Sequence, residues 1–363
     1  MPFKIGIIGC GGIANDKHMP ALAKHPDVEL TAFCDIIVER AEKAAKEYGV
    51  PGAKVYTDYR KLLEDKEISV IHVLTPNASH YEISVSAMEA GKHVMCEKPM
   101  AASKADAQGM MDTAKKTGKL FSVGYQYRHM DVFATMKRYC ETGALGDIYY
   151  AEACAIRRRG VPTWGVFTDK AQQGGGPLID IATHALDLTL WMMDNYEPKS
   201  VKGVSFEKLG RLLKPDEQGN TMGVWDPDTY EVEDAAFGFI VMKNGALINL
   251  KSSWALNILD HNHMVTLCGT KGGLDGSWRE GVRANHIIAG RQAVTNIETI
   301  SPRERIHPRM DFKNPNEMEV HYWINALHGK GDLFVKPEQA FVVTNILDAI
   351  YESARTGETI YFD

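Results

Sequence analysis

The sequence predicts two domains: an α/β domain with a doubly wound parallel sheet over residues 1–125, and an α+β domain with a large, mainly antiparallel open sheet over residues 126–363. Three observations predict this fold class. The 363 residues exceed the usual size of one domain. Short β-branched runs alternate with helical segments in the first third of the chain. Strand-like runs joined by turn residues dominate the rest.

In the first domain, buried strands are expected at 4–9, 28–35, 70–76, 93–99 and 120–126. Between them, residues 78–90 and 103–117 repeat Ala, Met and charged side chains at helical spacing. Because strand and helix alternate, the helices are crossover connections and the strands are parallel.

In the second domain, residues 233–254 contain two strand-like runs on either side of Asn244-Gly245. Both residues of that pair accept positive φ, which predicts a type I′ hairpin turn. A helical apolar pattern at 338–357 stops at Gly357. We expect this helix to pack back near the first domain.

Composition points to a small-molecule partner. The net charge is −6 and Lys and Arg are scattered, which predicts neither a nucleic-acid partner nor a membrane surface. No run of about eighteen apolar residues occurs. The apolar run at 5–14 is broken by four glycines, so it is not expected to be a signal peptide. The six cysteines form no C-x-x-C pair, which favours reduced thiols and a cytoplasmic protein.

A G-x-G-x-x-A motif follows the first strand and consists of Gly9, Gly11, Gly12, Ile13 and Ala14 with Cys10. A dinucleotide needs a tight turn at the first glycine, a bare backbone at the second beside the pyrophosphate, and a small residue where helix meets strand. The helix that follows offers unpaired N–H groups to the phosphates. Taken alone, the motif is equally compatible with a plain glycine turn.

Asp35 closes the second strand 21 residues after Ala14, near the spacing of about 20 expected for the acid that binds the ribose. Its charge would repel a 2′-phosphate, and Ile36 and Ile37 supply no cation to hold one. NAD is therefore favoured over NADP. Arg40 lies close enough to keep NADP open, and Asp35 as a solvated loop acid is the alternative.

Two short motifs end later strands, at the edge of a parallel sheet where ligands bind. Thr75-Pro76-Asn77 is expected against the cofactor, although it is also a good turn and helix cap. Glu97-Lys98-Pro99 places a lysine after a buried run. Partial desolvation beside a nicotinamide would lower the Lys98 pKa towards neutrality, as proton transfer requires. The alternative is a lysine with its ammonium in water.

A glycine loop at 174–176 precedes a predicted helix that carries Asp180 and His184 four residues apart, on one face, with Asp187 a turn further on. A carboxylate and an imidazole placed together can hold a substrate hydroxyl and pass its proton. Otherwise His184 is a helix histidine paired with Asp180 or Asp187.

Over its whole length the chain resembles the glucose–fructose oxidoreductase, inositol dehydrogenase and rhizopine-catabolism (Gfo/Idh/MocA) family. The marks are the Gly9–Ala14 loop, Thr75-Pro76-Asn77 with His80, Glu97-Lys98-Pro99, and a glycine loop before Asp180-x-x-x-His184. Ala182 stands where the family commonly has glycine. The resemblance implies that Lys98 and His184 serve the proton transfer, while Asp180 orients the reacting groups or relays the proton. It adds His80, Glu97, Lys98 and Gln126 to the cofactor-binding residues.

This resemblance implies an NAD-dependent oxidoreductase that moves hydride between a secondary alcohol of a sugar, glycoside or cyclitol and the nicotinamide. A glycoside-cleaving enzyme that oxidises, eliminates and re-reduces is the alternative, and a non-catalytic NAD sensor is disfavoured by Lys98 and His184. As in relatives, a homo-oligomer, a dimer or a tetramer, is expected.

Candidate substrate residues are Tyr127, Arg128, Arg157, Arg158, Trp164 and His184. Arginines and a tryptophan on one loop suit the hydroxyls and the apolar face of a sugar. A basic surface turn with Trp164 in the core is the alternative. The loop resembles family members that oxidise position 3 of glucosides, including plant C-glucosides. The polar stretch 208–230 is expected to be a loop or insertion. Asp260-His261-Asn262-His263 shows no third ligand, so no metal is predicted.

Overall fold

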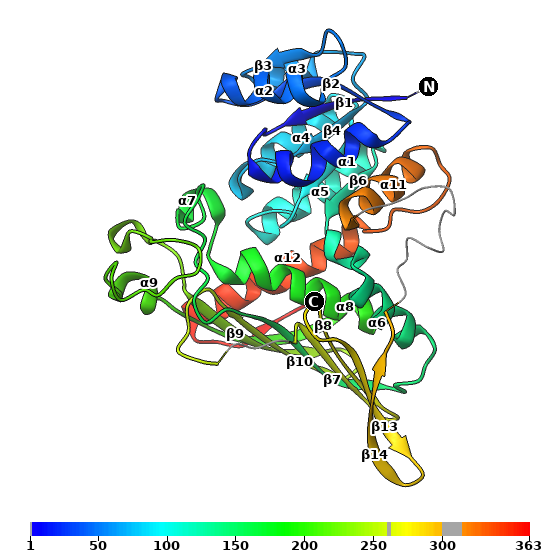
Figure 1. Cartoon of the computed structure of the whole chain (residues 1–363), viewed down its shortest axis with the longest axis vertical. Helices are drawn as coiled ribbons and strands as arrows, with labels where there is room; N and C mark the ends of the chain where they lie inside the picture. Colours follow the sequence, from blue (N-terminus) through cyan, green and yellow to red (C-terminus); the bar gives the residue numbers. More distant parts are fainter. Residues whose placement is uncertain (1, 260–262, 300–313) are drawn as a thin grey trace. The chain divides into compact units, whose positions relative to one another are not determined.

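The structure is a computed structural model that describes residues 2–259, 263–299 and 314–363 (Figure 1). These residues form two compact units. The first contains residues 2–126 and 314–341, and the second contains residues 127–259, 263–299 and 342–363. The segment 314–341 therefore groups with the first unit, whereas the sequence assigned everything after 125 to the second domain.

The first unit is built on a six-stranded sheet in the order β3-β2-β1-β4-β5-β6. All its neighbouring strands pair in parallel. This is the strand order of the Rossmann fold, and it confirms the predicted doubly wound sheet. The strands are β1 (Phe3–Ile8), β2 (Val28–Cys34), β3 (Lys54–Tyr56), β4 (Val70–Val73), β5 (His93–Glu97) and β6 (Phe121–Gly124). Strand β3 was not predicted, because three residues carry too short a pattern.

The connections of this unit are helical. They are η1 (Ala14–His18), α1 (Met19–Lys24), α2 (Val38–Tyr48), α3 (Tyr59–Leu63), η2 (Asn77–Ser79), α4 (His80–Glu89) and α5 (Lys104–Thr117). The helices expected at 78–90 and 103–117 are thus present. Helix α5 begins where the Ser103 hydroxyl accepts the Asp106 N–H, and it ends at Gly118, whose φ of 64° is left-handed.

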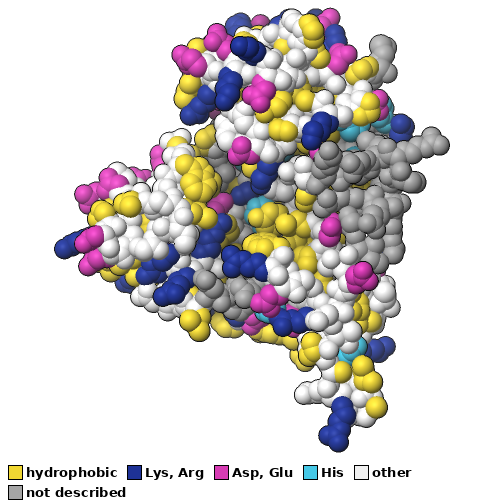
Figure 2. All heavy atoms as spheres, viewed as in Figure 1, with side chains coloured by type: hydrophobic (Ala, Val, Ile, Leu, Met, Phe, Trp, Pro, Cys, Tyr) yellow, Lys and Arg dark blue, Asp and Glu magenta, His cyan; other side chains and the backbone are white. Residues whose placement is uncertain are grey.

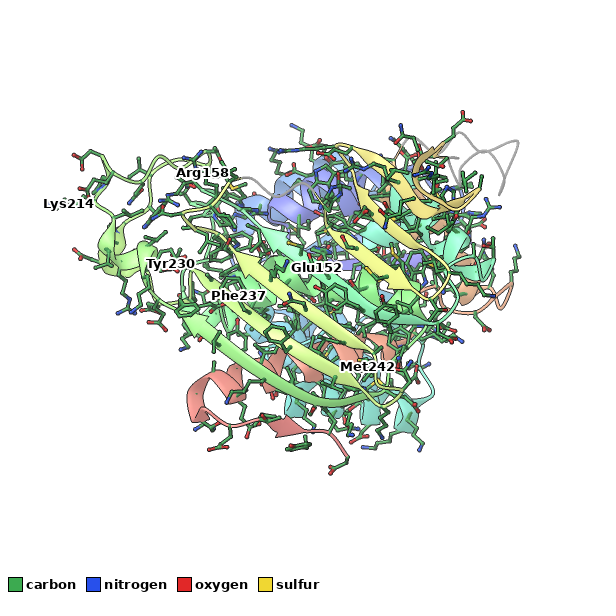
Figure 3. All side chains as sticks on the ribbon, turned by 90° about the horizontal axis from the view of Figure 1, so that it is seen from below. Glu152, Arg158, Lys214, Tyr230, Phe237 and Met242 are labelled. Carbon is green, nitrogen blue, oxygen red and sulfur yellow. The ribbon has the colours of Figure 1, made fainter. Side chains whose placement is uncertain are left out.

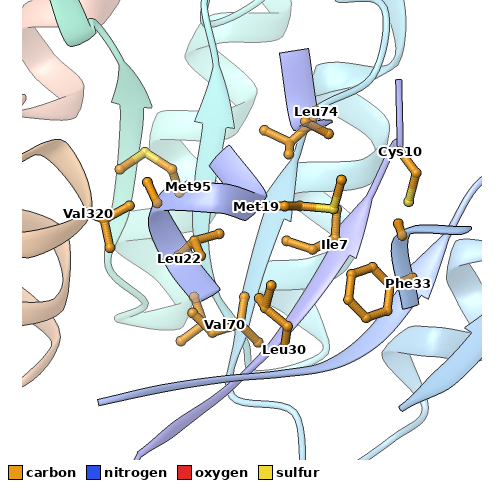
Figure 4. Close-up of a cluster of buried hydrophobic side chains, with 14 of the residues drawn as sticks. Ile7, Cys10, Met19, Leu22, Leu30, Phe33, Val70, Leu74, Met95 and Val320 are labelled. Atoms are coloured by element: carbon orange, nitrogen blue, oxygen red, sulfur yellow. The ribbon is translucent and has the colours of Figure 1, made fainter. Parts of the chain in front are cut away.

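The core of the first unit surrounds α1, whose Met19 and Leu22 pack with Ile7 and Phe33 (Figure 4). Helix α11 (Pro315–Leu327) contributes to this core with the buried side chains Val320, Trp323 and Ile324. Apolar burial of this kind is the main stabilising term in folding. It explains why a segment late in the sequence belongs to the first unit.

Helix α11 also brings a carboxylate into the first unit. Glu319 is buried, and its Oε1 has no hydrogen-bond partner among the described residues. Burial raises the pKa of Glu319 to about 7, although the positive charges of His18 and Lys17 act in the opposite direction. Nearby, His18 Nε2 lies 2.7 Å from Glu97 Oε1, and both side chains are buried.

The second unit is built on a nine-stranded sheet in the order β14-β13-β12-β11-β7-β10-β9-β8-β15. Among its described pairings, β7 and β10 run parallel and the others antiparallel. This confirms the mainly antiparallel sheet. The strands are β7 (Ile148–Ile156), β8 (Pro198–Phe206), β9 (Ala235–Met242), β10 (Leu247–Ser253), β11 (Val265–Gly269), β12 (Gly273–Ser277), β13 (Gly281–Ile288), β14 (Arg291–Ile297) and β15 (Ile360–Tyr361).

Helices cover one side of this sheet (Figure 1). Helix α8 contacts β7 and β11, and α6 contacts β12 and β13. The helical elements of the unit are η3 (Gln126–His129), α6 (Asp131–Glu141), α7 (Lys170–Gln173), η4 (Leu178–Ala182), α8 (Thr183–Met193), α9 (Leu209–Leu212), η5 (Pro227–Thr229) and α12 (Pro337–Thr356). The helix expected at 338–357 is α12. No described helix is long and apolar enough to cross a bilayer.

The hairpin between β9 and β10 is present, but its predicted type I′ turn is wrong. Only Gly245 has positive φ, at 89°, and Asn244 does not. Met242 N–H bonds Ala246 O and Gly245 N–H bonds Met242 O, so the loop has three residues. The Asn244 Oδ1 accepts the Ala246 N–H at 3.1 Å instead. This is the three-residue hairpin with a left-handed glycine at its end.

No described helix covers the side chains on the other face of the nine-stranded sheet (Figure 3). Phe239 of β9 and Tyr149 of β7 are exposed. The Lys251 ammonium bonds the Glu152 carboxylate at 2.8 Å across β10 and β7. Apolar side chains also gather on the hairpin of β13 and β14 (Figure 2), where Ile287 and Val294 are exposed. The face is therefore mixed in polarity.

The pKa of Glu319 predicts how stability changes with pH. Between its ordinary value of 4.5 and about 7 the folded protein keeps a proton that the unfolded chain has lost. The free energy of unfolding therefore falls as pH rises through this window. Glu319→Gln removes the loss, so the variant should be more stable than wild type at pH 8, by up to about 3 kcal/mol, and equal to it below pH ~4.5.

Urea unfolding at several pH values measures this difference. Glu39→Gln, at an exposed position of α2, is the control and should show no such trend. A lower free energy of unfolding for Glu319→Gln than for wild type at pH 8 would contradict the prediction. It would show that nearby positive charges stabilise the ionised Glu319 carboxylate.

Candidate active site

The predicted cofactor-binding residues of the first unit follow the carboxyl ends of β1, β2, β4, β5 and β6. Because these strands are parallel, their carboxyl ends share one edge of the sheet. The residues are Gly9, Gly11, Gly12, Ile13, Asp35, Thr75, Pro76, Asn77, His80, Glu97, Lys98 and Gln126. The topology thus collects at one edge the residues that are scattered over the first third of the sequence.

The glycine loop after β1 is shaped by close backbone approach. Gly9 has a φ of 93°, and a Cβ there would lie 2.5 Å from Leu74 O, so only glycine fits. At Gly11 no described atom lies within 4 Å of an added Cβ. That open backbone, followed at once by the N-terminal end of η1, fits the approach of a pyrophosphate.

Asp35 lies beside this loop. Its Oδ2 accepts the Cys10 N–H at 2.8 Å and its Oδ1 accepts the Ile37 N–H at 2.9 Å. A carboxylate has about four acceptor sites, so each oxygen retains one for a ribose hydroxyl. The neighbouring Ile36 is 91% exposed and brings an apolar side chain, not a cation. The residues present fit NAD.

His80 ties two strand ends together. Its Nε2 lies 3.0 Å from Thr75 O, after β4, and its Nδ1 lies 2.8 Å from Pro99 O, after β5. Complete burial lowers the pKa of this histidine, while the two carbonyls oppose that shift. The contacts hold the Thr75 and Lys98 segments at a constant separation.

Lys98 follows β5 and is half-buried. Its N–H donates to Glu97 Oε2 at 2.9 Å, and the Lys98-Pro99 peptide is cis. Burial acts to raise the pKa of Glu97, but the hydrogen bond from His18 and the charges of His18 and Lys98 hold it below its ordinary value. A carboxylate that stays ionised therefore lies at the base of the predicted catalytic lysine.

Gln126 begins η3 after β6. With its amide oriented to suit both neighbours, it donates to Gly124 O at 2.8 Å and accepts from Lys17 Nζ at 2.9 Å. Lys17 belongs to η1, the helix that follows the glycine loop. Gln126 thus joins the end of β6 to the cofactor loop.

In the second unit, Asp180 and His184 do not share one regular α-helix. Asp180 lies in the π-helix η4 and His184 in the first turn of α8, and both are buried. Asp180 Oδ2 accepts the Trp254 Nε1–H at 3.2 Å. The His184 ring stacks on Tyr127, with centroids 4.2 Å apart and planes 17° apart. The two predicted catalytic side chains of the second unit, Asp180 and His184, therefore each contact an aromatic residue.

The glycine loop before η4 is held by Glu233 and Tyr351. Glu233 accepts N–H groups from Gly176 at 2.9 Å and Leu178 at 3.1 Å, and the Tyr351 hydroxyl at 2.8 Å. A Cβ at Gly175 would lie 2.0 Å from the Tyr351 hydroxyl. Packing thus requires glycine at position 175. The loop fixes the start of η4, the segment that contains Asp180.

Arg128 and Asp187 form a fully buried ion pair. Arg128 Nε and Nη2 bond the two Asp187 oxygens at 2.9 and 2.6 Å. The guanidinium also lies 5.4 Å from the Trp191 ring. A pair of this geometry fixes η3 to α8. The Arg128 guanidinium and the Asp187 carboxylate therefore bind each other inside the second unit.

The loop after β7 presents side chains of different character. Arg157 Nη1 donates to Gly160 O at 2.9 Å, whereas Arg158 is exposed. Trp164 is 57% exposed, so it is not packed as a core residue. In the tetrapeptide considered for a metal, Asp260, His261 and Asn262 lie outside the described residues, and His263 Nε2 lies 2.7 Å from Arg283 Nη2. The described residues contain no cluster of three or more His, Cys, Asp and Glu suited to a metal.

Several supporting residues were not predicted. His18 and Trp254 contact the candidate residues Glu97 and Asp180. Glu233 and Tyr351 support the glycine loop before Asp180, and none of the four belongs to a motif. Each lies far from its partner in the sequence, and only the fold brings them together. The glycine run at 174–176 was the single local signal that something packs closely there.

Comparison with known proteins agrees with this arrangement. Residues 3–125 match the family model of the Gfo/Idh/MocA oxidoreductases with an NAD-binding Rossmann fold. Residues 133–275 match the model of the Gfo/Idh/MocA C-terminal domain. The resemblance seen in the sequence motifs is confirmed, as are NAD as cofactor and the oxidoreductase class.

Individual relatives extend the match. D-glucoside 3-dehydrogenase of Escherichia coli (strain K12) is 37% identical over 360 residues, covering 99% of this chain and 97% of the relative. Levoglucosan dehydrogenase of Pseudarthrobacter phenanthrenivorans is 28% identical over 96% of this chain and 95% of its own length. A solved levoglucosan dehydrogenase with NADH and levoglucosan superposes with a TM-score of 0.81 at 23% identity over 99% of both chains. The chain therefore belongs to the Gfo/Idh/MocA oxidoreductase family, and its first domain is that family's NAD-binding Rossmann domain.

Proposed function

We propose that this NAD-dependent oxidoreductase oxidises a secondary alcohol of a glucoside at position 3 of the sugar ring, C-glucosides included. The observation that carries this proposal is the match with a D-glucoside 3-dehydrogenase, which runs over 99% of the chain at 37% identity. The loop after β7 supports it, because both its Trp164 and its Arg158 are exposed, and a sugar offers hydroxyls to a cation and an apolar C–H face to an aromatic ring.

In this proposal Lys98 or His184 takes the proton of the substrate hydroxyl. When bound, NAD would accept the hydride that leaves the carbon bearing this hydroxyl. Asp180, held by Trp254, orients the hydroxyl. Stacking on Tyr127 fixes the plane of the His184 ring. Proposed cofactor contacts are the residues at the strand edge of the first unit.

The proposed substrate residues divide into two kinds. Tyr127, Arg157, Arg158 and Trp164 are proposed to touch the sugar or its substituent. Arg128 is proposed to act through η3, because its guanidinium is engaged by Asp187. Its loss would displace Tyr127, its neighbour in the chain, and with it the stacked His184.

A homo-oligomer, a dimer or a tetramer, is part of the proposal. The open face of the nine-stranded sheet and the hairpin of β13 and β14 expose Phe239, Tyr149, Ile287 and Val294. A second copy packed on these side chains would remove their apolar surface from water. Light scattering after size exclusion should give a multiple of the 40.3 kDa chain mass, and a monomer at assay concentration would contradict it.

The substrate is tested by incubating the enzyme and NAD with methyl and phenyl β-glucosides and with inositols. Glucosides should give NADH together with a 3-keto product. Release of the aglycone without net NADH would instead identify oxidation, elimination and re-reduction. NADH from inositols but from no glucoside would overturn the proposal.

Lys98→Ala should lose turnover and keep cofactor binding, because phosphates and ribose are held at other strand ends. We expect kcat to fall by about 10²- to 10⁴-fold, the usual contribution of a proton-transferring group. Because Lys98 is only one of the proposed cofactor contacts, NADH affinity, measured by fluorescence titration, should fall far less than kcat. Lys104→Ala, at an exposed position of α5, is the control. Full turnover in Lys98→Ala would remove Lys98 from the chemistry.

Asp35→Ser should weaken the preference for NAD over NADP, because the carboxylate both accepts ribose hydroxyls and repels a 2′-phosphate. A charged hydrogen bond of about 1.5–3 kcal/mol corresponds to roughly a 10- to 100-fold fall in the ratio of kcat/KM for the two cofactors. Asp35→Asn keeps the shape and separates loss of charge from loss of packing. An unchanged ratio in both variants would place Asp35 outside the ribose pocket.

A further inference from the structure

A chain of side chains leads from the Asp180 carboxylate to the surface of the second unit. Trp254 Nε1 donates to Asp180 and its ring is fully buried. Phe167 meets the Trp254 ring at a centroid distance of 6.2 Å and an angle of 79°. Trp164 meets Phe167 at 6.0 Å and 76°. These are edge-to-face contacts within the favourable range for aromatic pairs.

Burial decreases along this chain. Trp254 has no exposed surface, Phe167 is half-buried and Trp164 is 57% exposed. An isolated exposed tryptophan needs no special explanation. Trp164 is different because its ring continues a series of contacts that begins at a proposed catalytic carboxylate. The series therefore connects the exposed Trp164 ring to the buried Asp180 carboxylate through Phe167 and Trp254.

The aromatic loop, defined as residues 157–168, is held in place by the insertion, defined as residues 208–230. Asn220 accepts the Val161 N–H and donates to the Val161 O, both at 2.9 Å. Further bonds between the two segments join Thr163 Oγ1 to Met222 O, Thr221 Oγ1 to Arg159 O at 3.0 Å, and Arg159 Nε to Gln218 O at 3.0 Å. Hydrogen bonds from the insertion thus fix the backbone of the aromatic loop on the N-terminal side of Trp164.

The insertion has its own anchor. Trp225 is buried and its Nε1–H donates to Gly210 O at 2.7 Å. Gln218 donates to Trp225 O at 2.9 Å and accepts its N–H at 3.1 Å. Figure 3 shows Arg158 of the aromatic loop and Lys214 of the insertion towards the same end of the sheet. Ordering both segments in advance removes an entropic cost that a ligand would otherwise meet.

We propose that Trp164 and Phe167 form a subsite for a flat apolar aglycone, so that aryl glycosides are preferred over free hexoses and alkyl glycosides. This inference rests on the proposed function. In a pyranose one carbon separates position 3 from position 1, so a substituent on position 1 points away from a hydroxyl held at Asp180. The rings that lead outward from Asp180 lie where such a substituent can stack.

Kinetics with three substrates test the subsite. Wild type should prefer phenyl over methyl β-glucoside and over glucose by about tenfold in kcat/KM. Trp164→Ala should lose that preference, because KM for the phenyl glucoside should rise about tenfold more than KM for the methyl glucoside. Trp164→Phe should restore part of it. Tyr361→Ala, which removes a ring that is 73% exposed on β15, is the matched control and should change nothing.

Binding provides a readout that does not depend on turnover. Phenyl 3-deoxy-β-glucoside has no hydroxyl to oxidise at position 3, and its affinity in the presence of NADH is measured by calorimetry. Trp164→Ala should weaken this affinity by about tenfold relative to the methyl analogue. Equal effects of Trp164→Ala on phenyl and methyl ligands, or none, would overturn the subsite while position-3 oxidation stands. Wild type that oxidises no glucoside would overturn the proposed function, and the calorimetric comparison would still decide the subsite.

Discussion

The contact between the turn after β1 and the end of β4 is the constraint on which the first unit's site depends. Gly9 donates its N–H to Cys34 O at 2.8 Å, and its Cα lies so close to Leu74 that a side chain is impossible. This approach brings Cys10 N–H to the Asp35 carboxylate. The loop proposed for the phosphates and the acid proposed for the ribose are thereby fixed to each other before a ligand binds, and the shared edge of parallel strands adds Lys98 to the same region.

Buried carboxylates hold the loops of both units. Asp35, Glu233 and Asp234 each accept two backbone N–H groups, and Glu97 accepts one together with the His18 imidazole. A buried charge is tolerated only where hydrogen bonds replace its water, so each acid specifies one loop geometry. The cofactor loop, the lysine proposed for catalysis, the helix that carries Asp180 and the insertion are each held in this way.

The sequence predicts local features well. The G-x-G-x-x-A motif and Asp35 lie within one βαβ unit, where spacing reports geometry directly. Long-range partners leave no such trace: Glu233 lies 57 residues from Gly176, and nothing in its neighbourhood shows that it supports a glycine loop. Arg128 was interpreted as a substrate residue because it follows a strand. Its bond with Asp187, 59 residues away, depends on packing that local patterns do not contain.

Helical irregularity is the other feature that periodicity does not reveal. The helix after the glycine loop contains the π-helical segment η1 at Ala14–His18, and the helix with Asp180 and His184 contains η4 at Leu178–Ala182. The prediction for Asp180 and His184 assumed one regular helix of 3.6 residues per turn, whereas Asp180 lies in a π-helical segment that the apolar pattern does not reveal. In the structure the segment with Asp180 faces Trp254, and the end of η1 turns His18 towards Glu97. Such segments are rare and concentrate at functional sites, so η1 and η4 agree with the proposed site although no sequence pattern indicated them.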